Sequence, residues 1–498
     1  MLSGRCCGVL LHPTSLPGSG GIGTLGADAR RFVDLLHEMG MSIWQVLPLT
    51  PPACGNSPYS AFSAFAGNPL LLDLDQLAVE GDLPHDYQFK KFPDNKVDFR
   101  AVEKYKLPLL RQAAETFFAA GGNARKEEFW HFCNSTGWLH DYALFMALKK
   151  RYKNKSWHQW PEGLALLKQE TYEKVSEEFG TEIGLHKYMQ WQFHRQWHAL
   201  RSYANSQGIR LFGDIPIFVA HDSVDVWRNR NIFLLDGKGA PTVVAGVPPD
   251  YFSSTGQLWG NPLYNWNILE QQKYDWWIER FRQTFILFDG IRIDHFRGFE
   301  AAWHVPAGDP TAEHGTWTKG PGSKFFDEVF AALGKLPIIA EDLGVITPEV
   351  ETLLEYCGYP GMKILQFAFD SGSDNPYLPH NHNRNCVVYT GTHDNNTTQG
   401  WYDTISPTLR HETREYIGCE NSDIAGSMLR IALMSVADTA IVPFQDLLGL
   451  PSEARMNMPG TTEGNWEWRF SWGMIPRHMG PVMAEMVERY GRNRKDNK

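Results

Sequence analysis

Eight short apolar runs, each ending in polar residues, recur along the chain and limit its fold more than any other feature. Several are separated by stretches such as 26–40 and 347–358, in which apolar residues recur at intervals of three and four, as on the buried face of a helix. Strands that alternate with helices favour a parallel sheet, and eight of them predict an α/β fold, a closed (β/α)8 TIM barrel. The runs occupy residues 8–15, 42–50, 208–216, 288–296, 336–344, 361–370, 385–396 and 439–446.

The polar residues that end these runs are rich in carboxylates. In a (β/α)8 barrel the functional groups lie at the C-terminal ends of the strands, which meet at one mouth. We therefore expect an acidic site at that mouth. Its candidate residues are Asp214, Asp294, Glu341 with Asp342, His393 with Asp394, and Gln445 with Asp446.

The length of the chain requires additions to the barrel. A bare barrel needs about 250 residues, whereas this chain has 498. We expect one catalytic barrel domain over 1–498, with a mainly helical insertion at 80–205 between strands 2 and 3. A second insertion, 217–285, is expected to include a loop, 246–262, that covers the site at the barrel mouth. Within the helical insertion, Tyr188, Trp191 and Trp197 are expected to form a core, and the basic run 149–155 a solvated helix end.

Composition and charge exclude several classes of partner. The net charge is −10 and no basic arm occurs, so the charge pattern of a nucleic-acid-binding protein is missing. No run approaches the roughly 20 apolar residues of a membrane span. The seven cysteines are scattered without a CxxC pair, which argues against a disulfide framework or zinc site and favours a cytoplasmic location. Aromatic residues form 13% of the chain, which suits either a large core or a site for sugar rings.

The stretch FDGIRIDHFRG, 288–298, places Arg292 and Asp294 on the same face of a short strand. The guanidinium would keep the neighbouring carboxylate ionised at neutral pH, as a nucleophile requires. The alternative is a structural salt bridge that lines the barrel.

Two further carboxylates follow apolar runs. Glu341 ends the run LPIIA, and apolar surroundings would raise its pKa so that it can donate a proton. The alternative is a charge at a helix N-terminus. Asp394 lies beside His393 in a polar loop, where both could bind hydroxyl groups or form an Asx turn. A metal site at HNH, 380–382, is the weaker reading of the polar residues.

A nucleophile, an acid and a third carboxylate at one barrel mouth are the groups that cleave glycosidic bonds. Longer motifs narrow this class. The segments HPTSLPGSGGIGTLG, WQVLPL, SPYSAFSAFAGNPLL, GDIPIFVAHDSVDVW, GVPPDYFSSTGQLWGNPLY, RIDHFRGFE, AEDLG, PGMKILQFAFD, TGTHDNNTT and SEARMNMPG resemble, in order, the 4-α-glucanotransferases called amylomaltases or disproportionating enzymes, of the α-amylase clan. The resemblance implies a barrel with inserted subdomains, no C-terminal β-sandwich, no cofactor, no metal, and transfer of α-1,4-glucan segments with retention.

The resemblance also implies roles for single residues. Asp294 matches the nucleophile, Glu341 the acid/base and Asp394 the stabiliser of the transition state. The matching substrate-binding residues are Tyr59, Asp214, Tyr251, Phe252, Trp259, Arg292, His295 and His393. One position departs from the family pattern, because Asn396 stands where THDND would place an aspartate.

The expected enzyme transfers glucan from a malto-oligosaccharide, starch or glycogen chain to the 4-hydroxyl of an acceptor glucan or glucose. The expected route is a double displacement through a glucosyl-aspartate intermediate. We expect a monomer with glucan substrates as its partners. Two alternatives stay open: a hydrolytic α-amylase, and a glucan-binding protein that has lost catalysis.

Overall fold

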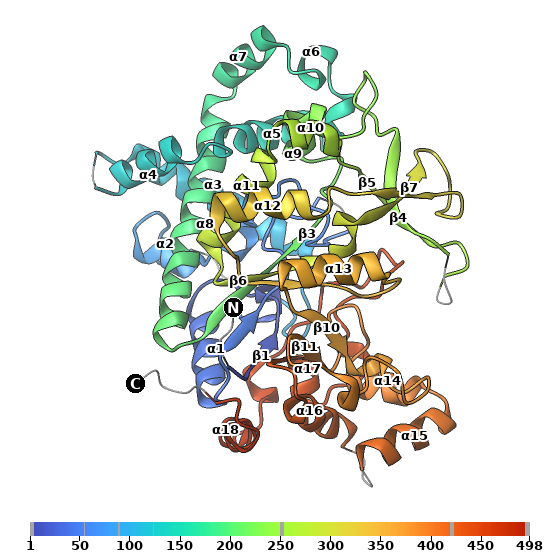
Figure 1. Cartoon of the computed structure of the whole chain (residues 1–498). Helices are drawn as coiled ribbons and strands as arrows, with labels where there is room; N and C mark the ends of the chain where they lie inside the picture. Colours follow the sequence, from blue (N-terminus) through green and yellow to red (C-terminus); the bar gives the residue numbers. More distant parts are fainter. Residues whose placement is uncertain are drawn as a thin grey trace.

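Figure 1 shows the computed structural model of the chain, which describes residues 4–53, 55–87, 90–122, 124–249, 253–418 and 423–493. All eight predicted strands form, and they pair in parallel in the order β10-β11-β12-β1-β2-β3-β6-β9. The Ala340 N–H donates to the Pro360 carbonyl at 3.0 Å, next to the free edges of β9 and β10, so the sheet nearly closes. The predicted (β/α)8 barrel is therefore confirmed. Its strands are β1 (Cys6–Leu10), β2 (Ile43–Gln45), β3 (Arg210–Pro216), β6 (Gly290–Asp294), β9 (Ile338–Ala340), β10 (Gly361–Ile364), β11 (Cys386–Tyr389) and β12 (Thr439–Pro443).

The barrel strands are apolar on both faces because helices cover one face and the barrel interior lies on the other. Every residue of β1, β11 and β12 is buried. Between β3 and β6, Asp214 pairs with Arg292 and Pro216 with Asp294. Phe288 and Phe212 pack where a Cβ on Gly213 or Gly290 would come within 2.4 Å of their rings, so both glycines are needed for this close approach. This register brings the polar ends of two strands together.

The two predicted helices form close to their predicted limits. The stretch 26–40 gives α1, which buries Ala29, Phe32, Val33 and Leu36, and 347–358 gives α13. Gly40 and Gly358 follow these helices with φ of +71° and +68°, the left-handed conformation that glycine adopts readily. The helices between or after barrel strands include α1 (Ala27–Glu38), α11 (Asp275–Leu287), α12 (Ser323–Leu333), α13 (Pro348–Cys357), α14 (Thr398–Thr404), α15 (Pro407–Ile417), α16 (Ile424–Met434), α17 (Phe444–Leu447) and α18 (Met479–Arg489).

The chain between β2 and β3 forms a group of helices, at upper left in Figure 1. Tyr188, Trp191 and Trp197 on α8 are buried, as predicted. Lys150, Arg151, Lys153 and Lys155 are exposed, as predicted for a solvated basic run. Lys149 is the exception, because its side chain is buried and its Nζ lies 2.5 Å from Asp222 Oδ2. A buried ammonium group needs such a partner. The helices are α2 (Leu74–Val79), α3 (Phe99–Ala119), α4 (Ala124–Ser135), α5 (Leu139–Arg151), α6 (Glu162–Ala165), α7 (Gln169–Glu178) and α8 (Gly180–Ser206).

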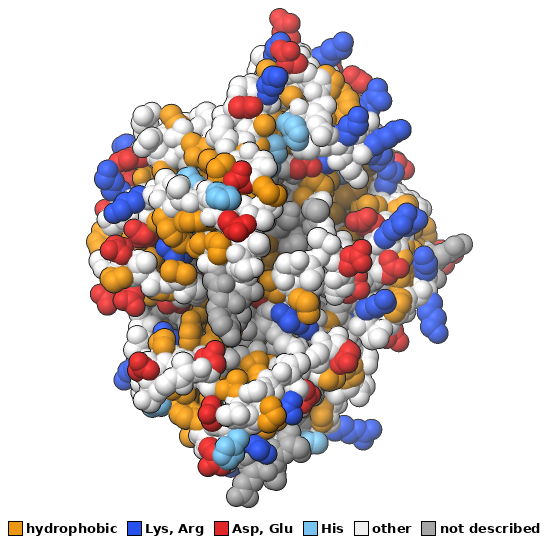
Figure 2. Space-filling view, turned by 90° about the vertical axis from the view of Figure 1, so that its right-hand side faces the viewer, with side chains coloured by type: hydrophobic (Ala, Val, Ile, Leu, Met, Phe, Trp, Pro, Cys, Tyr) orange, Lys and Arg blue, Asp and Glu red, His pale blue; other side chains and the backbone are white. Residues whose placement is uncertain are grey.

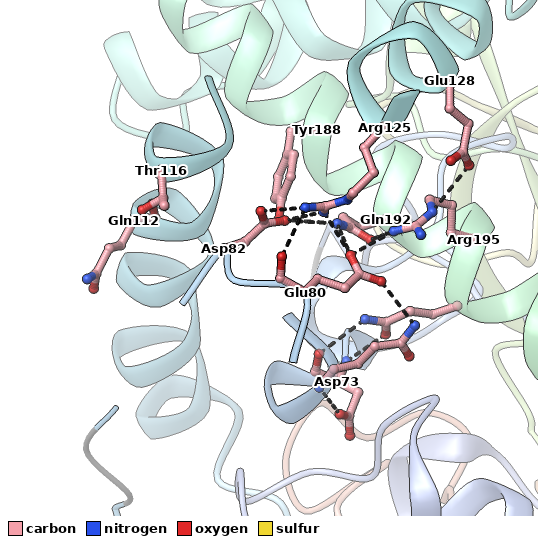
Figure 3. A network of polar contacts seen from close by, with 12 residues as sticks. Asp73, Glu80, Asp82, Gln112, Thr116, Arg125, Glu128, Tyr188, Gln192 and Arg195 are labelled. Carbon is pink, nitrogen blue, oxygen red and sulfur yellow. Dashed lines mark hydrogen bonds and ion pairs between the residues drawn. The ribbon is translucent and has the colours of Figure 1, made fainter. Parts of the chain in front are cut away.

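A network of polar contacts joins these helices (Figure 3). Arg125 on α4 donates to both carboxylate oxygens of Asp82, at 2.9 and 2.5 Å, and to Glu80 at 2.8 Å. From α8, Tyr188 donates to Asp82 at 2.6 Å and Arg195 to Glu80 at 2.7 Å. The network therefore links α4, α8 and the segment after α2.

A second sheet was not predicted. It is antiparallel, in the order β5-β4-β7-β8, and lies at right in Figure 1. Its strands are β4 (Val243–Val247), β5 (Gln257–Pro262), β7 (Ala301–Pro306) and β8 (Thr316–Lys319), and the helices α9 (Val224–Arg228) and α10 (Trp266–Gln271) flank its first two strands in the chain. Two strands come from the connection after β3 and two from the connection after β6, so the sheet joins separate additions to the barrel.

In the described part of the chain, no helix combines the length and the apolar character that crossing a membrane requires.

Candidate active site

The C-terminal ends of β3 and β6 bring Asp214, Arg292 and Asp294 together, as predicted. Arg292 Nε lies 2.9 Å from Asp214 Oδ2, and Arg292 Nη2 lies 2.7 Å from Asp294 Oδ1. The side chain of Asp214 is 0% exposed, whereas that of Asp294 is 31% exposed. Asp294 is therefore the carboxylate of this pair that a substrate can reach.

Tyr59 completes this cluster from the loop after β2. Its hydroxyl donates to Asp214 Oδ2 at 2.7 Å and accepts from Arg292 Nη2 at 3.2 Å. Burial raises the pKa of Asp214 to about 7, although Arg292 and Tyr59 act in the opposite direction. The Tyr59 ring also stacks on His393, with centroids 5.0 Å apart. Tyr59 therefore joins the β3 and β6 groups to the loop that carries Asp394.

Glu341 follows β9, the neighbour of β6. Its carboxylate accepts from the His295 N–H at 2.7 Å and from the Leu343 N–H at 2.8 Å. Burial, and then the nearby charge of Asp294, raise the pKa of Glu341 to about 8. The direction agrees with the prediction of a proton donor, but the charge of Asp294 adds a cause that the sequence did not reveal.

His295 has φ of +55°, a conformation that costs a non-glycine residue about 1–2 kcal/mol. This conformation directs its N–H at Glu341. Burial lowers the pKa of its imidazole to about 3, so the ring is neutral. Its Nε2 is buried and accepts or donates no hydrogen bond within the described residues. Strain of this kind is common at functional sites.

His393 and Asp394 lie on the loop after β11. His393 Nε2 is 3.4 Å from Asp394 Oδ2, and burial lowers the pKa of His393. The side chain of Asp394 is 47% exposed. Two contacts of this loop were missed: Asn457 Nδ2 donates to Asp394 Oδ1 at 2.6 Å, and the Trp466 ring lies 5.8 Å from that of His393. The motif SEARMNMPG contains Asn457, but its spacing says nothing about this contact.

Trp259 on β5 is half-exposed and meets the His295 ring edge to face, with centroids 4.8 Å apart. The predicted substrate residues Tyr251 and Phe252 lie outside the described residues. The side of the molecule with β4, β5 and β7 faces the viewer in Figure 2, where hydrophobic side chains border a hollow near the middle. Apolar side chains in a hollow suit the apolar faces of sugar rings.

Two of the acids at strand ends have structural partners instead. Asp342 accepts from the Met362 N–H at 2.6 Å. Asp446 accepts from the hydroxyls of Thr390 and Thr398 at 2.5 and 2.7 Å. The described residues contain no group of three His, Cys, Asp or Glu side chains arranged to hold a metal ion. At the HNH stretch, the ring nitrogens of His382 contact Ser435 and the Tyr377 carbonyl.

Known proteins resemble this chain along nearly its whole length. A sequence model of one family, described as 4-alpha-glucanotransferase, matches residues 11–475. The chain belongs to the 4-alpha-glucanotransferase family. Two members of the family, both named 4-alpha-glucanotransferase, are 48% identical to it. The Synechocystis sp. protein matches over 99% of both chains, and the Thermus thermophilus protein over 97% of this chain and 99% of its own.

Solved structures support the same family assignment. The amylomaltase from Streptococcus agalactiae in complex with acarbose superposes with a TM-score of 0.95 at 39% identity, covering 98% of this chain and 100% of that one. The amylomaltase from Corynebacterium glutamicum shares the fold, with a TM-score of 0.78 at 18% identity, 99% of this chain and 76% of that chain being covered. The predicted family, fold and enzyme class, a 4-alpha-glucanotransferase, are therefore confirmed.

Proposed function

We propose that this family member transfers α-1,4-glucan segments with retention, using Asp294 as nucleophile, Glu341 as acid/base and Asp394 as stabiliser of the transition state. The donor is a malto-oligosaccharide, starch or glycogen chain, and the acceptor is the 4-hydroxyl of a glucan or glucose. The observation that carries the proposal is the pair of carboxyl groups at adjoining strand ends. Asp294 lies against a guanidinium, whereas Glu341 has a pKa raised to about 8.

In the first step Asp294 attacks the anomeric carbon with Oδ2, the oxygen that Arg292 does not hold. The bond from that carbon to the leaving glucan oxygen breaks, and the proton of Glu341 moves to that oxygen. Positive charge develops on the ring in the transition state, and Asp394 stabilises it. The product is a β-glucosyl ester of Asp294 and a free glucan end.

In the second step Glu341, now a carboxylate, takes the proton of the acceptor 4-hydroxyl. The acceptor oxygen attacks the anomeric carbon, the ester bond breaks and Asp294 is released. The His295 and Leu343 N–H groups donate to Glu341 and would stabilise its charge between the two steps.

The remaining predicted residues are assigned either to substrate binding or to support of the nucleophile, and Asp214, whose side chain is fully buried, belongs to the second group. Tyr59, Asp214 and Arg292 form one hydrogen-bonded cluster beside Asp294, and His393 stacks on Tyr59. The buried Nε2 of His295 has no hydrogen-bond partner within the described residues, so it can bind a sugar hydroxyl once the substrate displaces the atoms that cover it.

We assign the preference for a sugar acceptor over water to the loop 246–262. Trp259, Tyr251 and Phe252 are its aromatic residues, and stacking on a glucan ring would exclude water. Replacing Tyr251 and Phe252 by alanine together should raise the ratio of hydrolysis to transfer by about tenfold. An unchanged ratio, from product and reducing-end assays, would remove the loop as the cause.

The deciding experiment incubates purified protein with maltotriose and follows both the product ladder and the total reducing ends. Transfer gives glucose and longer chains while reducing ends stay constant. A rise in reducing ends would favour an α-amylase-type hydrolase, and an unchanged substrate would favour a glucan-binding protein.

Asp294→Asn and Glu341→Gln should each lower the rate of this reaction at least about 100-fold with the fold intact. Near-normal turnover in either variant would refute the role of the residue that it replaces.

We also infer that the chain acts as a cytoplasmic monomer, with 80–205 and 217–285 as insertions in one barrel domain. The cysteines within the described residues are free thiols, which supports a reducing compartment: Cys6, Cys7, Cys133, Cys357 and Cys386.

A further inference from the structure

Residues 452–457, here called the 452–457 segment, follow the last barrel strand and lie against the loop 392–396 that carries Asp394. The segment begins with a short 3-10 helix, Ser452–Ala454. It has no role in the steps proposed above. Four hydrogen bonds join it to the loop: Asn457 Nδ2 to Asp394 Oδ1 at 2.6 Å, Arg455 Nη2 to the Asp394 carbonyl at 2.5 Å, the Asn457 N–H to the His393 carbonyl at 3.1 Å, and Asn396 Nδ2 to Ser452 Oγ at 2.9 Å.

Arg455 and Asn457 act on Asp394 as one unit. The guanidinium of Arg455 donates through Nη2 to the Asp394 backbone and through Nε to the Asn457 carbonyl, at 2.7 Å. The Asn457 amide then holds one oxygen of the Asp394 carboxylate, while the other faces His393 at 3.4 Å. Backbone and side chain of Asp394 are thus fixed from the same short segment.

Packing holds the Asp394 side chain weakly, although the neighbouring His393 is buried. The Asp394 side chain is 47% exposed, so about half of its surface touches no protein atom. A cavity of about 20 Å³ lies beside the loop, and Thr392, Asn395, Arg455 and Met456 are among its lining residues. Directional hydrogen bonds, rather than close packing, therefore set the position of the carboxylate.

We propose that Arg455 and Asn457 are positioning residues that aim Asp394 at the reacting sugar. The proposal rests on the role given to Asp394 under the proposed function. A carboxylate that stabilises developing charge must already be oriented when the transition state forms, because reorientation during the reaction would cost part of the stabilisation. The Asn457 amide occupies Oδ1 and leaves Oδ2, on the His393 side, for the sugar.

The same contacts give Asn396 a role. Its Oδ1 accepts from the Thr397 N–H at 2.9 Å, and its Nδ2 donates to Ser452. An aspartate here could accept the Thr397 N–H bond as Asn396 does and could accept a bond from the Ser452 hydroxyl in place of the one that Asn396 donates, but it would add a negative charge to the Asp394 loop. The amide thus keeps this attachment without a second charge.

The test compares Asn457→Ala and Arg455→Lys with wild type in maltotriose disproportionation. We expect kcat to fall about 10–100-fold in Asn457→Ala and less in Arg455→Lys, which keeps the charge. KM should change less than about threefold, because the loss falls on the transition state. Affinity for acarbose, the ligand in the Streptococcus agalactiae structure, should fall in step with kcat/KM. Glu453→Gln is the control, since Glu453 belongs to the same segment but is exposed.

A double-mutant cycle separates positioning from a general structural effect. In an Asp394→Asn background, followed with α-maltosyl fluoride so that slow turnover is measurable, Asn457→Ala should change the rate less than about twofold. An equal loss in both backgrounds, or a wild-type kcat in Asn457→Ala with an unchanged melting temperature, would overturn the proposal. Wild-type activity of Asp394→Asn alone would instead refute the role of Asp394 in the proposed function.

Discussion

Glu341 shows at the scale of a single residue how the barrel mouth separates two carboxyl groups. Its backbone N–H donors favour the charged form, while burial and the Asp294 charge favour the neutral form and prevail. The pKa rises from 4.5 to about 8. The folded protein therefore holds this proton at a pH where the unfolded chain has lost it.

This difference predicts a pH dependence of stability. Between pH 4.5 and about 8 unfolding releases the Glu341 proton, so raising the pH through this window destabilises the wild type. Glu341→Gln removes the effect. We expect the free energy of unfolding of the variant to rise by roughly 1–3 kcal/mol relative to wild type between pH 5 and pH 8.5, less than the full shift because Glu341 is only partly buried. Thermal unfolding across this range measures it, and parallel curves would contradict it.

Single residues also show what the sequence could predict. Alternation along one strand was enough to place Arg292 beside Asp294, because their separation is local. Glu341 and Asp394 were found as polar ends of apolar runs. Asn457, Arg455 and Trp466 were not, because their contacts with the Asp394 loop join segments far apart in the chain, as the 63-residue separation of Asn457 and Asp394 shows.

At the scale of elements, the barrel strands could be predicted from the sequence and the strands of the small sheet could not. Barrel strands were predictable because they are apolar throughout and flanked by helical periodicity. The small sheet was missed because four residues in a row are exposed in β5 and all four are exposed in β8, so neither strand has the alternation of a half-buried strand. Its pairing depends on contacts between two separate connections.

Among the helices of the β2–β3 connection, the Arg125 network predicts a large effect on stability. Arg125→Met leaves the carboxylates of Asp82 and Glu80 without this partner, and their side chains are only 4% and 15% exposed. We expect a loss of about 2–4 kcal/mol, seen as a lower unfolding temperature, with turnover changed less than about twofold. The matched control is Arg111→Met, whose ion pair with Glu182 is more exposed and should contribute about 0–1 kcal/mol. Equal losses in the two variants would contradict this account.

For the whole molecule, the order of apolar runs was enough to predict the barrel, because eight strands in parallel order have few alternative closures. No comparable sequence pattern predicts how many copies of the chain assemble. Large exposed apolar side chains lie on separate elements, such as Val79 on α2, Trp130 on α4 and Tyr356 on α13, and the net charge of −10 opposes self-association. Light scattering should give the 56.7 kDa of one chain at all concentrations tested, and a mass that rises with concentration would contradict the monomer.

The small sheet has a consequence for the history and engineering of the chain. Because β4 and β5 come from one barrel connection and β7 and β8 from another, the Val243–Pro306 to Gly246–Trp303 register ties the two connections together. A change in the length of one connection alters the pairing surface of the other. We therefore expect a chimaera that exchanges these connections between family members to need both of them from the same parent.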